Sequence, residues 1–509
     1  MRSYYLFFGE VMKMFKELYD YIYSIRKLKR VDIYSIVNAT LIANPYISKF
    51  PEAFLFDSLP RKNFSSSLIL NIFLYYIYNA VRLINYLAIL FFFKRYYNKK
   101  LPIVTKNCII LDLYVNVESV VNQGEFSDKY FGRLYSVLEE ENRNYIFIPR
   151  LIGVSSNPFK ACCQLVSFFK IMSLDRHLYI FEFEFFSGKH FFKLLQLYLL
   201  YPFRTLNLLS KNNTASDKVF NFYLKKDISK QSIVPFTRYI FGKNLNSVTG
   251  LTKIYSWSEF QVTERAFNFG LRKVGGIKVT ACQFLVTYPS HFNMHVQDID
   301  EEQGSAPSLV LVNGPQYVLE RSKVNYQVGV SLRYDNVYRY RPRYDGSQVL
   351  VLGSYSLLET TNILKMVNGL DGAIFKSHPA VGNLQFSRFL NERIRAVDGN
   401  IYDLFPRCAL VVGSASGSLV EAIACGVSVL LIARENELVT NPMSDVGKGK
   451  IWDLAYSSSE VTVKIAELIA FRSANKDEIV NISGWYRDNF FVEPSSEKIR
   501  QTFRLDSSI

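Results

Sequence analysis

Residues 409–432 read Ala-Leu-Val-Val-Gly-Ser-Ala-Ser-Gly-Ser-Leu-Val-Glu-Ala-Ile-Ala-Cys-Gly-Val-Ser-Val-Leu-Leu-Ile. This pattern predicts an apolar strand, a Gly/Ser loop, a short helix and a second apolar strand. Such a unit directs loop hydroxyls and the free N–H groups of a helix N-terminus to one point beyond a parallel sheet. That point suits a phosphate. Small residues in such a loop also serve strand–helix packing, so a purely structural loop remains an alternative.

A second stretch, Ala373–Ala380, reads Ala-Ile-Phe-Lys-Ser-His-Pro-Ala. His378 follows an apolar strand, and Pro379 restricts the local backbone and ends that strand. A lone histidine is more often structural than catalytic. One at the carboxyl end of a parallel strand, upstream of a phosphate-type loop, fits a ligand site at that edge of the sheet.

These motifs resemble the donor half of GT-B glycosyltransferases. The resemblance rests on Lys-x-His-Pro, the Ser-rich loop and Glu-Ala-x-Ala-x-Gly. It is closest to enzymes with cytidine-activated donors: bacterial sialyltransferases, Kdo transferases and, more distantly, CDP-glycerol polymerases. It implies that the imidazole and the loop hold the donor phosphate and that Glu421 contacts the ribose. The implied donor-binding residues are Lys376, His378, Pro379, Ser414, Ser416, Gly417, Ser418 and Glu421.

A further resemblance reaches upstream and brings the total to roughly residues 105–480. It rests on Leu111-Asp-Leu-Tyr114, Phe126-Ser-Asp-Lys-Tyr-Phe-Gly132, Ile148-Pro-Arg-Leu-Ile-Gly153 and Trp257-Ser-Glu259. These motifs are similar to the acceptor half of bacterial surface-carbohydrate (capsule and lipopolysaccharide) biosynthesis proteins. The resemblance marks a family of proteins without naming its sugar.

Two carboxylates are candidates for the base that deprotonates an acceptor hydroxyl. We expect Asp112 to end the first strand of the acceptor lobe and point into the cleft, with capping of the next turn as the alternative. Glu259 is expected to begin an amphipathic helix, where it would alternatively complement the helix dipole. The nearest match to the sialyltransferase base motif, Asp300–Gly304, is predicted to be a solvated acidic loop. His291 and His295 are predicted to be surface residues rather than metal ligands.

The order of elements predicts an α/β protein with two parallel-sheet, Rossmann-like lobes facing a cleft, and the resemblance implies that this fold is of the GT-B class. Apolar strands are expected at Leu178–Phe186 and Val349–Gly353, among others, and helices at Leu357–Asn368 and Leu384–Ala396. The predicted domains are a basic helical region at 1–104, an acceptor lobe at 105–338, a donor lobe at 339–480 and a helical tail at 481–509.

The composition limits the partners. The 509-residue chain has a formal net charge of +15, six cysteines without metal spacing and no evident signal peptide. We therefore expect buried free thiols, a cytoplasmic protein and no metal or other cofactor. Residues 1–100 hold 15 Lys/Arg against 6 Asp/Glu. Their apolar content favours an anionic membrane surface over nucleic acid as the partner of this segment.

Residues 68–93 are apolar except for Asn71, Asn79, Arg82 and Asn85. At about 100° per residue these four positions share one stripe of a helix. An interfacial helix with its apolar side in the acyl boundary is the preferred interpretation. A core helix with its polar stripe toward solvent and a spanning helix remain alternatives, although Arg82 would be costly near a bilayer centre.

Together these features predict an inverting, metal-independent glycosyltransferase, peripheral on the inner face of the plasma membrane. Its donor would be a CMP-nonulosonate or CMP-Kdo type nucleotide sugar and its acceptor a lipid-linked glycan. An NDP-hexose or CDP-glycerol transferase of the same fold is an alternative. So is a non-catalytic component bound to polysaccharide-assembly partners.

Overall fold

The computed structural model describes residues 8–56, 67–105, 108–319, 322–379, 381–434 and 440–505. It divides into two compact lobes. The first lobe comprises the chain up to Phe284 together with His291–Leu311 and Leu319–Gln327. The second comprises Leu285–Ser290, Val312–Val318 and the chain from Val328 onward. The helical region predicted at 1–104 therefore belongs to the first lobe, and the predicted tail to the second.

The first lobe contains a seven-stranded sheet in the order β3-β2-β1-β4-β5-β6-β7. The pairs from β3 to β5 are parallel. Strand order reverses between β1 and β4, which makes this the topological switch point of the sheet. The strands are β1 Ile109–Asn116, β2 Tyr145–Ile152, β3 Leu178–Tyr179, β4 Lys253–Trp257, β5 Lys278–Gln283, β6 Leu309–Val312 and β7 Tyr326–Val328.

The second lobe contains a six-stranded sheet in the order β10-β9-β8-β11-β12-β13, parallel throughout. Its switch point lies between β8 and β11. The strands are β8 Gln348–Leu352, β9 Ala373–Lys376, β10 Ile394–Ala396, β11 Cys408–Gly413, β12 Ser428–Ile432 and β13 Trp452–Ala455. Two parallel-sheet α/β lobes are thus present, as the sequence predicts.

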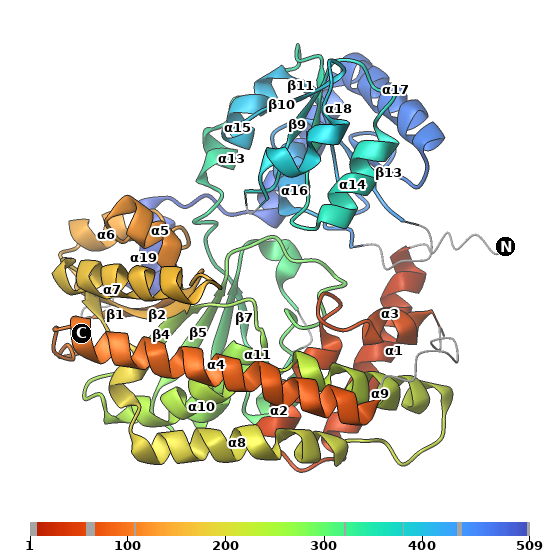
Figure 1. The fold of residues 1–509 in the computed structure, drawn as a ribbon. Helices are drawn as coiled ribbons and strands as arrows, with labels where there is room; N and C mark the ends of the chain where they lie inside the picture. Colours follow the sequence, from red (N-terminus) through yellow and green to blue (C-terminus); the bar gives the residue numbers. More distant parts are fainter. Residues whose placement is uncertain are drawn as a thin grey trace. The chain divides into compact units, whose positions relative to one another are not determined.

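Helices surround both sheets (Figure 1). In the first lobe they are α1 Phe8–Lys27, α2 Ile33–Ala43, α3 Phe50–Leu55, α4 Leu68–Tyr96, α5 Val117–Gln123, α6 Leu134–Glu140, α7 Pro158–Leu174, α8 Gly188–Leu206, α9 Ala215–Lys226, α10 Val234–Asn244, α11 Val262–Arg272 and α12 Asp298–Gln303. In the second they are α13 Asp335–Arg339, α14 Leu357–Met366, α15 Ile401–Leu404, α16 Gly417–Ala424, α17 Ser458–Ala474, α18 Lys476–Phe490 and α19 Ser496–Phe503.

Alternating side chains of β11 build two separate cores in the second lobe. Val411 packs into one core with residues of α16 and α18, while Leu410 and Val412 pack into the other with residues of α14 and α17. The alternation follows from the period of two along a strand. Helices on both faces explain why this strand is apolar throughout.

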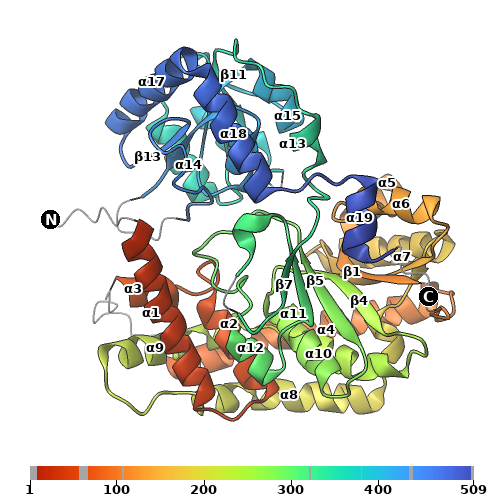
Figure 2. The same cartoon turned by 180° about the vertical axis from the view of Figure 1, so that it is seen from behind.

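In the first lobe, α10 and α11 pack closely and cover one face of the sheet (Figure 2). Glycines at the crossing permit this approach. A Cβ on Gly242 would lie 2.6 Å from the Phe267 carbonyl oxygen, and one on Gly270 would lie 2.4 Å from that of Tyr239. Two backbones can come this near only where no side chain separates them.

Two predicted elements differ from those observed. The helix expected at Leu384–Ala396 is a 3₁₀ segment, Asn383–Phe389, followed by β10. The Asn391 side chain accepts hydrogen bonds from the backbone N–H groups of Arg393 and Ile394, which turns the chain before β10 pairs with β9. The strand expected at Leu178–Phe186 ends at Tyr179 and continues as a 3₁₀ turn.

Helix α4 turns its polar stripe toward the protein. Its buried residues are Asn71, Tyr75, Asn79, Tyr86 and Phe93. Asn71 donates to the Lys225 carbonyl and Tyr75 to the Tyr198 carbonyl. The core alternative, in which the polar stripe meets solvent, is therefore wrong for these residues. Asn85 alone among the four polar positions is exposed.

Asn79 joins α4 to the segment that precedes α10. Its amide nitrogen donates to the Gln231 carbonyl at 2.9 Å, and its amide oxygen accepts from the Ile233 N–H at 3.0 Å. The side chain is fully buried. An apolar replacement would leave both backbone groups without this partner, and buried unpaired groups carry the full cost of desolvation.

We predict that Asn79→Ala lowers the free energy of unfolding by about 2–3 kcal/mol, because two buried hydrogen bonds are lost. Asn85→Ala, on the same helix but exposed, should change it by less than about 0.5 kcal/mol. Urea titration followed by circular dichroism measures both. Equal effects of the two substitutions would contradict the assigned orientation of α4.

Candidate functional site

Loops that follow β8, β9 and β11 meet at the carboxyl edge of the second sheet. Neighbouring parallel strands lie about 4.8 Å apart, so the loops after β9 and β11, on either side of β8, begin about 10 Å from each other. This is the edge of the switch point, where parallel α/β sheets bind their ligands.

The loop after β11 leads directly into α16. Ser416 is the N-cap of that helix, and its side chain accepts a hydrogen bond from the Ser418 N–H. Gly417 lies so near Val286 that a Cβ would come within 3.2 Å of the Val286 Cβ. The positive dipole end of α16 favours an anion here.

Lys376 ends β9, and His378 follows two residues later. Both side chains are half-buried, whereas Pro379 is exposed. The imidazole lies edge-on to the Tyr355 ring, with centroids 6.4 Å apart. Burial, and then the charge of Lys376, lower the pKa of His378 below its usual value of 6.5. The free protein therefore holds this ring neutral at pH 7, as a hydrogen-bonding group that an anion can convert to a cation.

Glu359, in the first turn of α14, connects the loops after β8 and β11. Its carboxylate accepts hydrogen bonds from Ser354 at 2.6 Å and from Ser414 at 3.4 Å. Ser414, predicted to hold phosphate, thus faces a carboxylate. The sequence analysis missed Glu359, although Ser356-Leu-Leu-Glu359 has the Ser-x-x-Glu pattern of a capping box after an apolar strand.

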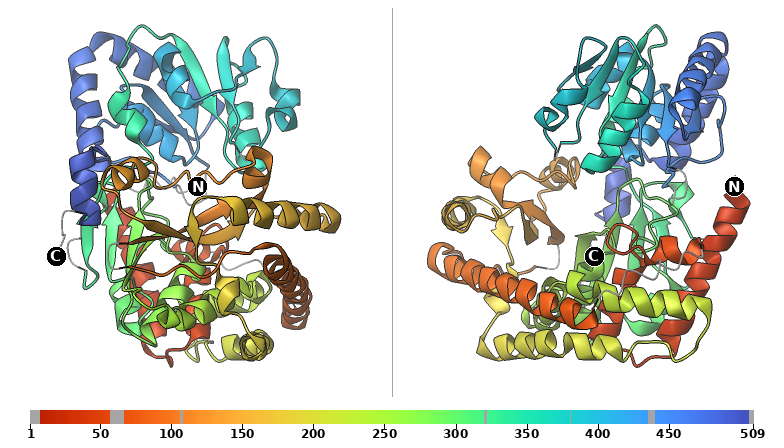
Figure 3. Two further views of the ribbon diagram at one scale, coloured as in Figure 1. Left: turned by 90° about the vertical axis from the view of Figure 1, so that its left-hand side faces the viewer. Right: turned by 45° about the vertical axis from the view of Figure 1, so that its right-hand side comes forward.

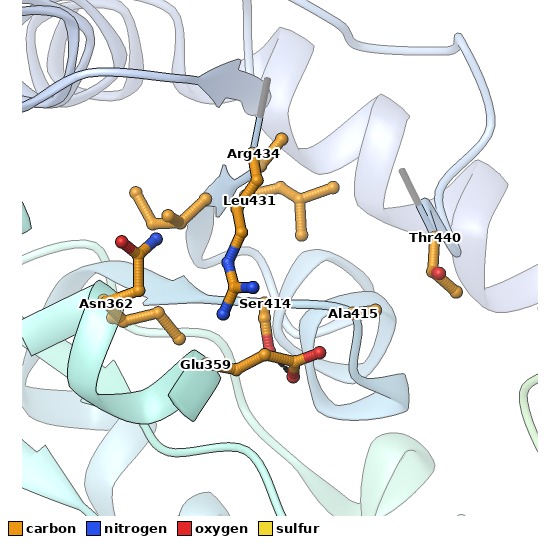
Figure 4. Close-up of a pocket in the computed structure, with 10 residues that line it drawn as sticks. Glu359, Asn362, Ser414, Ala415, Leu431, Arg434 and Thr440 are labelled. Carbon is orange, nitrogen blue, oxygen red and sulfur yellow. Dashed lines mark hydrogen bonds between the residues drawn. The ribbon is translucent and has the colours of Figure 1, made fainter. Parts of the chain in front are cut away.

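A pocket opens beside Glu359 at this edge of the sheet. It has a volume of about 470 Å³ that includes its solvent-filled mouth. Figure 4 shows the Arg434 side chain extending from the end of β12 toward Ser414 and Glu359. The lining residues are Glu359, Asn362, Ile363, Ser414, Ala415, Leu431, Ile432, Ala433, Arg434 and Thr440. The pocket therefore presents a carboxylate, an amide, two hydroxyls and a guanidinium.

Glu421, predicted to bind ribose, lies one turn into α16. Its carboxylate accepts a hydrogen bond from the Tyr402 hydroxyl. Burial raises the pKa of Glu421, while Tyr402, Arg333 and Ser418 act in the opposite direction. One oxygen is thus held by the protein, and the carboxylate has a fixed orientation.

No protein-family model matches the chain, and no curated protein matches it. Three solved structures illustrate the similar folds. UDP-GlcNAc 2-epimerase from Methanocaldococcus jannaschii, in complex with UDP-GlcNAc and UDP, has 11% identity and a TM-score of 0.41 over 78% of this chain and 99% of that chain. Alr3699/HepE from Anabaena, in complex with UDP-glucose, has 14% identity and a TM-score of 0.39 over 79% of this chain and 99% of that chain. A variant of the wall teichoic acid polymerase TagF soaked with CDPG has 9% identity and a TM-score of 0.39 over 88% of this chain and 100% of that chain.

In the first lobe, Asp112 does not end its strand. β1 continues for four residues beyond it, to Asn116, and the carboxylate is fully buried. Arg238 donates to both carboxylate oxygens, at 2.9 and 3.0 Å, and the Ser256 hydroxyl donates at 2.7 Å. The expectation that Asp112 ends its strand and points into the cleft is wrong, because long-range partners hold it inside the lobe.

Glu259 lies two residues beyond the end of β4, at the switch point of the first sheet. It precedes α11 by three residues and so does not begin that helix. The residue is half-buried. Its charge raises the pKa of Tyr114 on the neighbouring strand β1, after the larger effects of burial and of Glu264 and against that of Arg150. Of the two predicted bases, Glu259 is the one at a ligand-binding edge.

Other predicted surface groups are buried. Asp300 forms ion pairs with Arg26 and Arg265, which lower its pKa although burial alone would raise it. His291 is buried too, and burial lowers its pKa to about 3. Cys162 and Cys163, expected to be buried, are exposed on α7. In the described parts of the chain, no three His, Cys, Asp or Glu side chains form a group able to hold a metal.

We predict that Asp112→Asn destabilises the first lobe by about 3–5 kcal/mol, because it leaves the buried Arg238 without its counter-charge. Glu118→Gln removes an ion pair with Lys160 in which both side chains are about half exposed. That control should cost less than about 1 kcal/mol. Denaturant titration monitored by tryptophan fluorescence compares the two variants. A mild effect of Asp112→Asn would show that the carboxylate is not a core counter-charge.

Proposed function

We propose that the protein is a glycosyltransferase that moves a sugar from a nucleotide donor, bound by the second lobe, to a lipid-linked glycan at the cytoplasmic face of the membrane. One observation carries the proposal. In a fully parallel sheet, Lys376 and His378 at the end of β9 and the N-terminus of α16 after β11 share the carboxyl edge with a polar pocket lined by Glu359, Ser414 and Arg434. A nucleotide diphosphate or monophosphate ester matches this chemistry.

Different parts of the site suit different parts of the donor. Lys376, the N-terminus of α16 and His378, which becomes a cation when an anion binds, suit the phosphate and the negative charge that grows on it as the sugar leaves. Glu359 suits hydrogen-bond donors such as ribose hydroxyls or a base amino group, and it orients Ser414. Glu421, held by Tyr402, can serve a ribose hydroxyl in the same way.

The preferred donor is a CMP-activated nonulosonate or Kdo-type sugar, on the basis of the Lys-x-His-Pro and Ser-rich motifs. An NDP-hexose or CDP-glycerol is the second candidate. Protein cations supply the charge neutralisation that a metal would otherwise provide, so the proposed transfer is independent of metals. Inversion by a single displacement requires a base near the acceptor hydroxyl, and Glu259 is the candidate.

The test begins with thermal-shift screening of the purified chain against CMP, CDP, UDP, GDP and dTDP. A ligand at 100 times its dissociation constant stabilises the bound protein by about 2.7 kcal/mol, which is readily measured. The matching nucleotide sugar is then incubated with a lipid-linked acceptor, with and without EDTA. Transfer that survives EDTA supports the proposal. Absence of nucleotide binding would indicate a non-catalytic component, and conversion of the donor sugar without an acceptor would indicate an epimerase.

We predict that His378→Ala lowers turnover by roughly 100-fold, the scale of losing one electrostatic stabiliser, while the fold persists. Binding of a phosphate ester should also raise the pKa of His378, because the anion favours the imidazolium. Affinity for a phosphodiester-linked donor should therefore rise as the pH falls from about 7.5 to 5.5. Calorimetry of wild type and His378→Gln measures this dependence, and an equal pH dependence in the two would remove His378 from the phosphate site.

We predict that Glu259→Gln reduces transfer by roughly 100-fold or more and leaves nucleotide affinity unchanged, because the amide cannot accept the acceptor proton. Glu118→Gln, an exposed carboxylate of the same lobe, is the matched control. Paired measurements of kcat and of nucleotide affinity decide the result. Normal kcat in Glu259→Gln would exclude this residue as the base.

A further inference from the structure

The outward side of α4 is apolar and exposed. Its buried positions lie within about 80° on the helical wheel, and seven exposed aliphatic and aromatic side chains occupy the opposite side. Their exposed fractions range from 37% for Leu87 to 80% for Ile69. These outward residues are Ile69, Phe73, Ile77, Val81, Ile84, Leu87 and Phe91. A soluble helix normally has the reverse arrangement, with apolar residues inside and polar residues outside.

Helix α8 repeats this arrangement. Leu194, Leu197 and Tyr201 are buried, whereas Phe192, Leu199 and Phe203 point away from them. The outward three are 71%, 45% and 59% exposed. Their spacing of seven and then four residues places them on one side of the helix. Nothing in the sequence analysis singled out this second helix.

The two helices are neighbours and run antiparallel. The Tyr76 hydroxyl donates to the Leu199 carbonyl and the Tyr198 hydroxyl to the Tyr76 carbonyl, each at 2.8 Å. Further along α4, Tyr86 packs against Phe186, just before α8 begins. Figures 1 and 3 show α4 and α8 side by side on the outside of the first lobe. We call the ten outward apolar residues of the two helices the α4/α8 face.

The charged residues of these two helices have one sign. Neither α4 nor α8 contains an Asp or a Glu. Both contain basic residues, of which Lys94, Arg95, Lys189, Lys193 and Arg204 are exposed. Lysine and arginine beside a broad apolar surface match an anionic lipid headgroup layer above an acyl region. A protein partner with charges of both signs at its rim would not require α4 and α8 to lack carboxylates.

The hydrogen bonds of α4 also define how it can meet a bilayer. Asn71, Tyr75 and Asn79 bond to backbone carbonyls of its own lobe along one side of the helix. A spanning position would break these bonds and place polar side chains in hydrocarbon, where unpaired groups are costly. With these bonds intact, only the opposite side of α4 is available to lipid.

We propose that the α4/α8 face docks flat on an anionic bilayer, with its apolar side chains in the acyl boundary and its lysines and arginines among the headgroups, and that α4 does not cross the membrane. This inference deepens the proposed function, since it rests on a membrane-borne acceptor and names the surface that brings the enzyme to it. Lipid binding is measured separately from transfer, so either proposal can fail alone.

The experiment is co-sedimentation of the full chain with vesicles of phosphatidylcholine containing phosphatidylglycerol, compared with phosphatidylcholine alone. Ile84→Asp on α4 and Phe203→Asp on α8 should each weaken binding by roughly 10-fold, because a charge enters the acyl boundary. Val274→Asp and Val480→Asp replace exposed valines outside the face and serve as matched controls. Far-UV circular dichroism and the thermal unfolding midpoint should be equal in all four variants, which checks that each is folded without relying on nucleotide binding.

Charge and topology are tested in the same assay. Replacing Lys189, Lys193 and Arg204 with Gln should weaken binding at low salt and have little effect at high salt, because headgroup attraction is screened. Alkaline carbonate should release the wild-type protein from vesicles. Wild-type-like binding by Ile84→Asp and Phe203→Asp would overturn the proposal. Resistance to carbonate would overturn the flat orientation, and a dimer in solution that Ile84→Asp dissociates would assign the face to a second copy of the chain instead.

Discussion

In the second lobe, β8 lies in the middle of a parallel sheet, and the chain builds outward from it in both directions. Parallel strands need crossover helices, and right-handed crossovers in opposite directions place those helices on opposite faces of the sheet. The loops after β8 and β11 therefore diverge at the carboxyl edge and leave room between them. Every feature of the candidate donor site, from Glu359 to the N-terminus of α16, depends on this reversal of strand order.

Strand order also reverses in the first lobe, between β1 and β4, but different side chains lie near this switch point. Below the edge, the lobe neutralises its charges internally: Asp112 is enclosed by Arg238 and Ser256, and Asp300 by Arg26 and Arg265. Such buried networks hold packed elements in register, since removing one partner leaves an uncompensated charge. A group enclosed in this way cannot reach a substrate. Glu259, beyond the end of β4, is not enclosed to the same degree.

One side of helix α4 packs against the first lobe, and the opposite side is exposed. Polar side chains usually face water because buried polar groups must find partners. Here the lobe supplies those partners as backbone carbonyls, so α4 can bury its polar stripe and leave leucine, isoleucine and phenylalanine outside. The cost of exposing that surface to water is removed if lipid covers it. The arrangement in α8 repeats the same solution beside it.

The sequence by itself determined the class of fold and the carboxyl edge of the second sheet as the position of the candidate site. Apolar strands, Gly/Ser loops and strand-terminal polar residues are local patterns, and Lys376, His378 and Ser416 lie where those patterns predict. The stripe on residues 68–93 was equally visible. The groups that contact this stripe, or a buried carboxylate, could not be predicted from the sequence, because they are distant in the chain. Arg238 contacts Asp112, and Gln231 contacts Asn79. Local periodicity defines which residues share a side, whereas only tertiary packing decides whether that side meets protein, water or lipid.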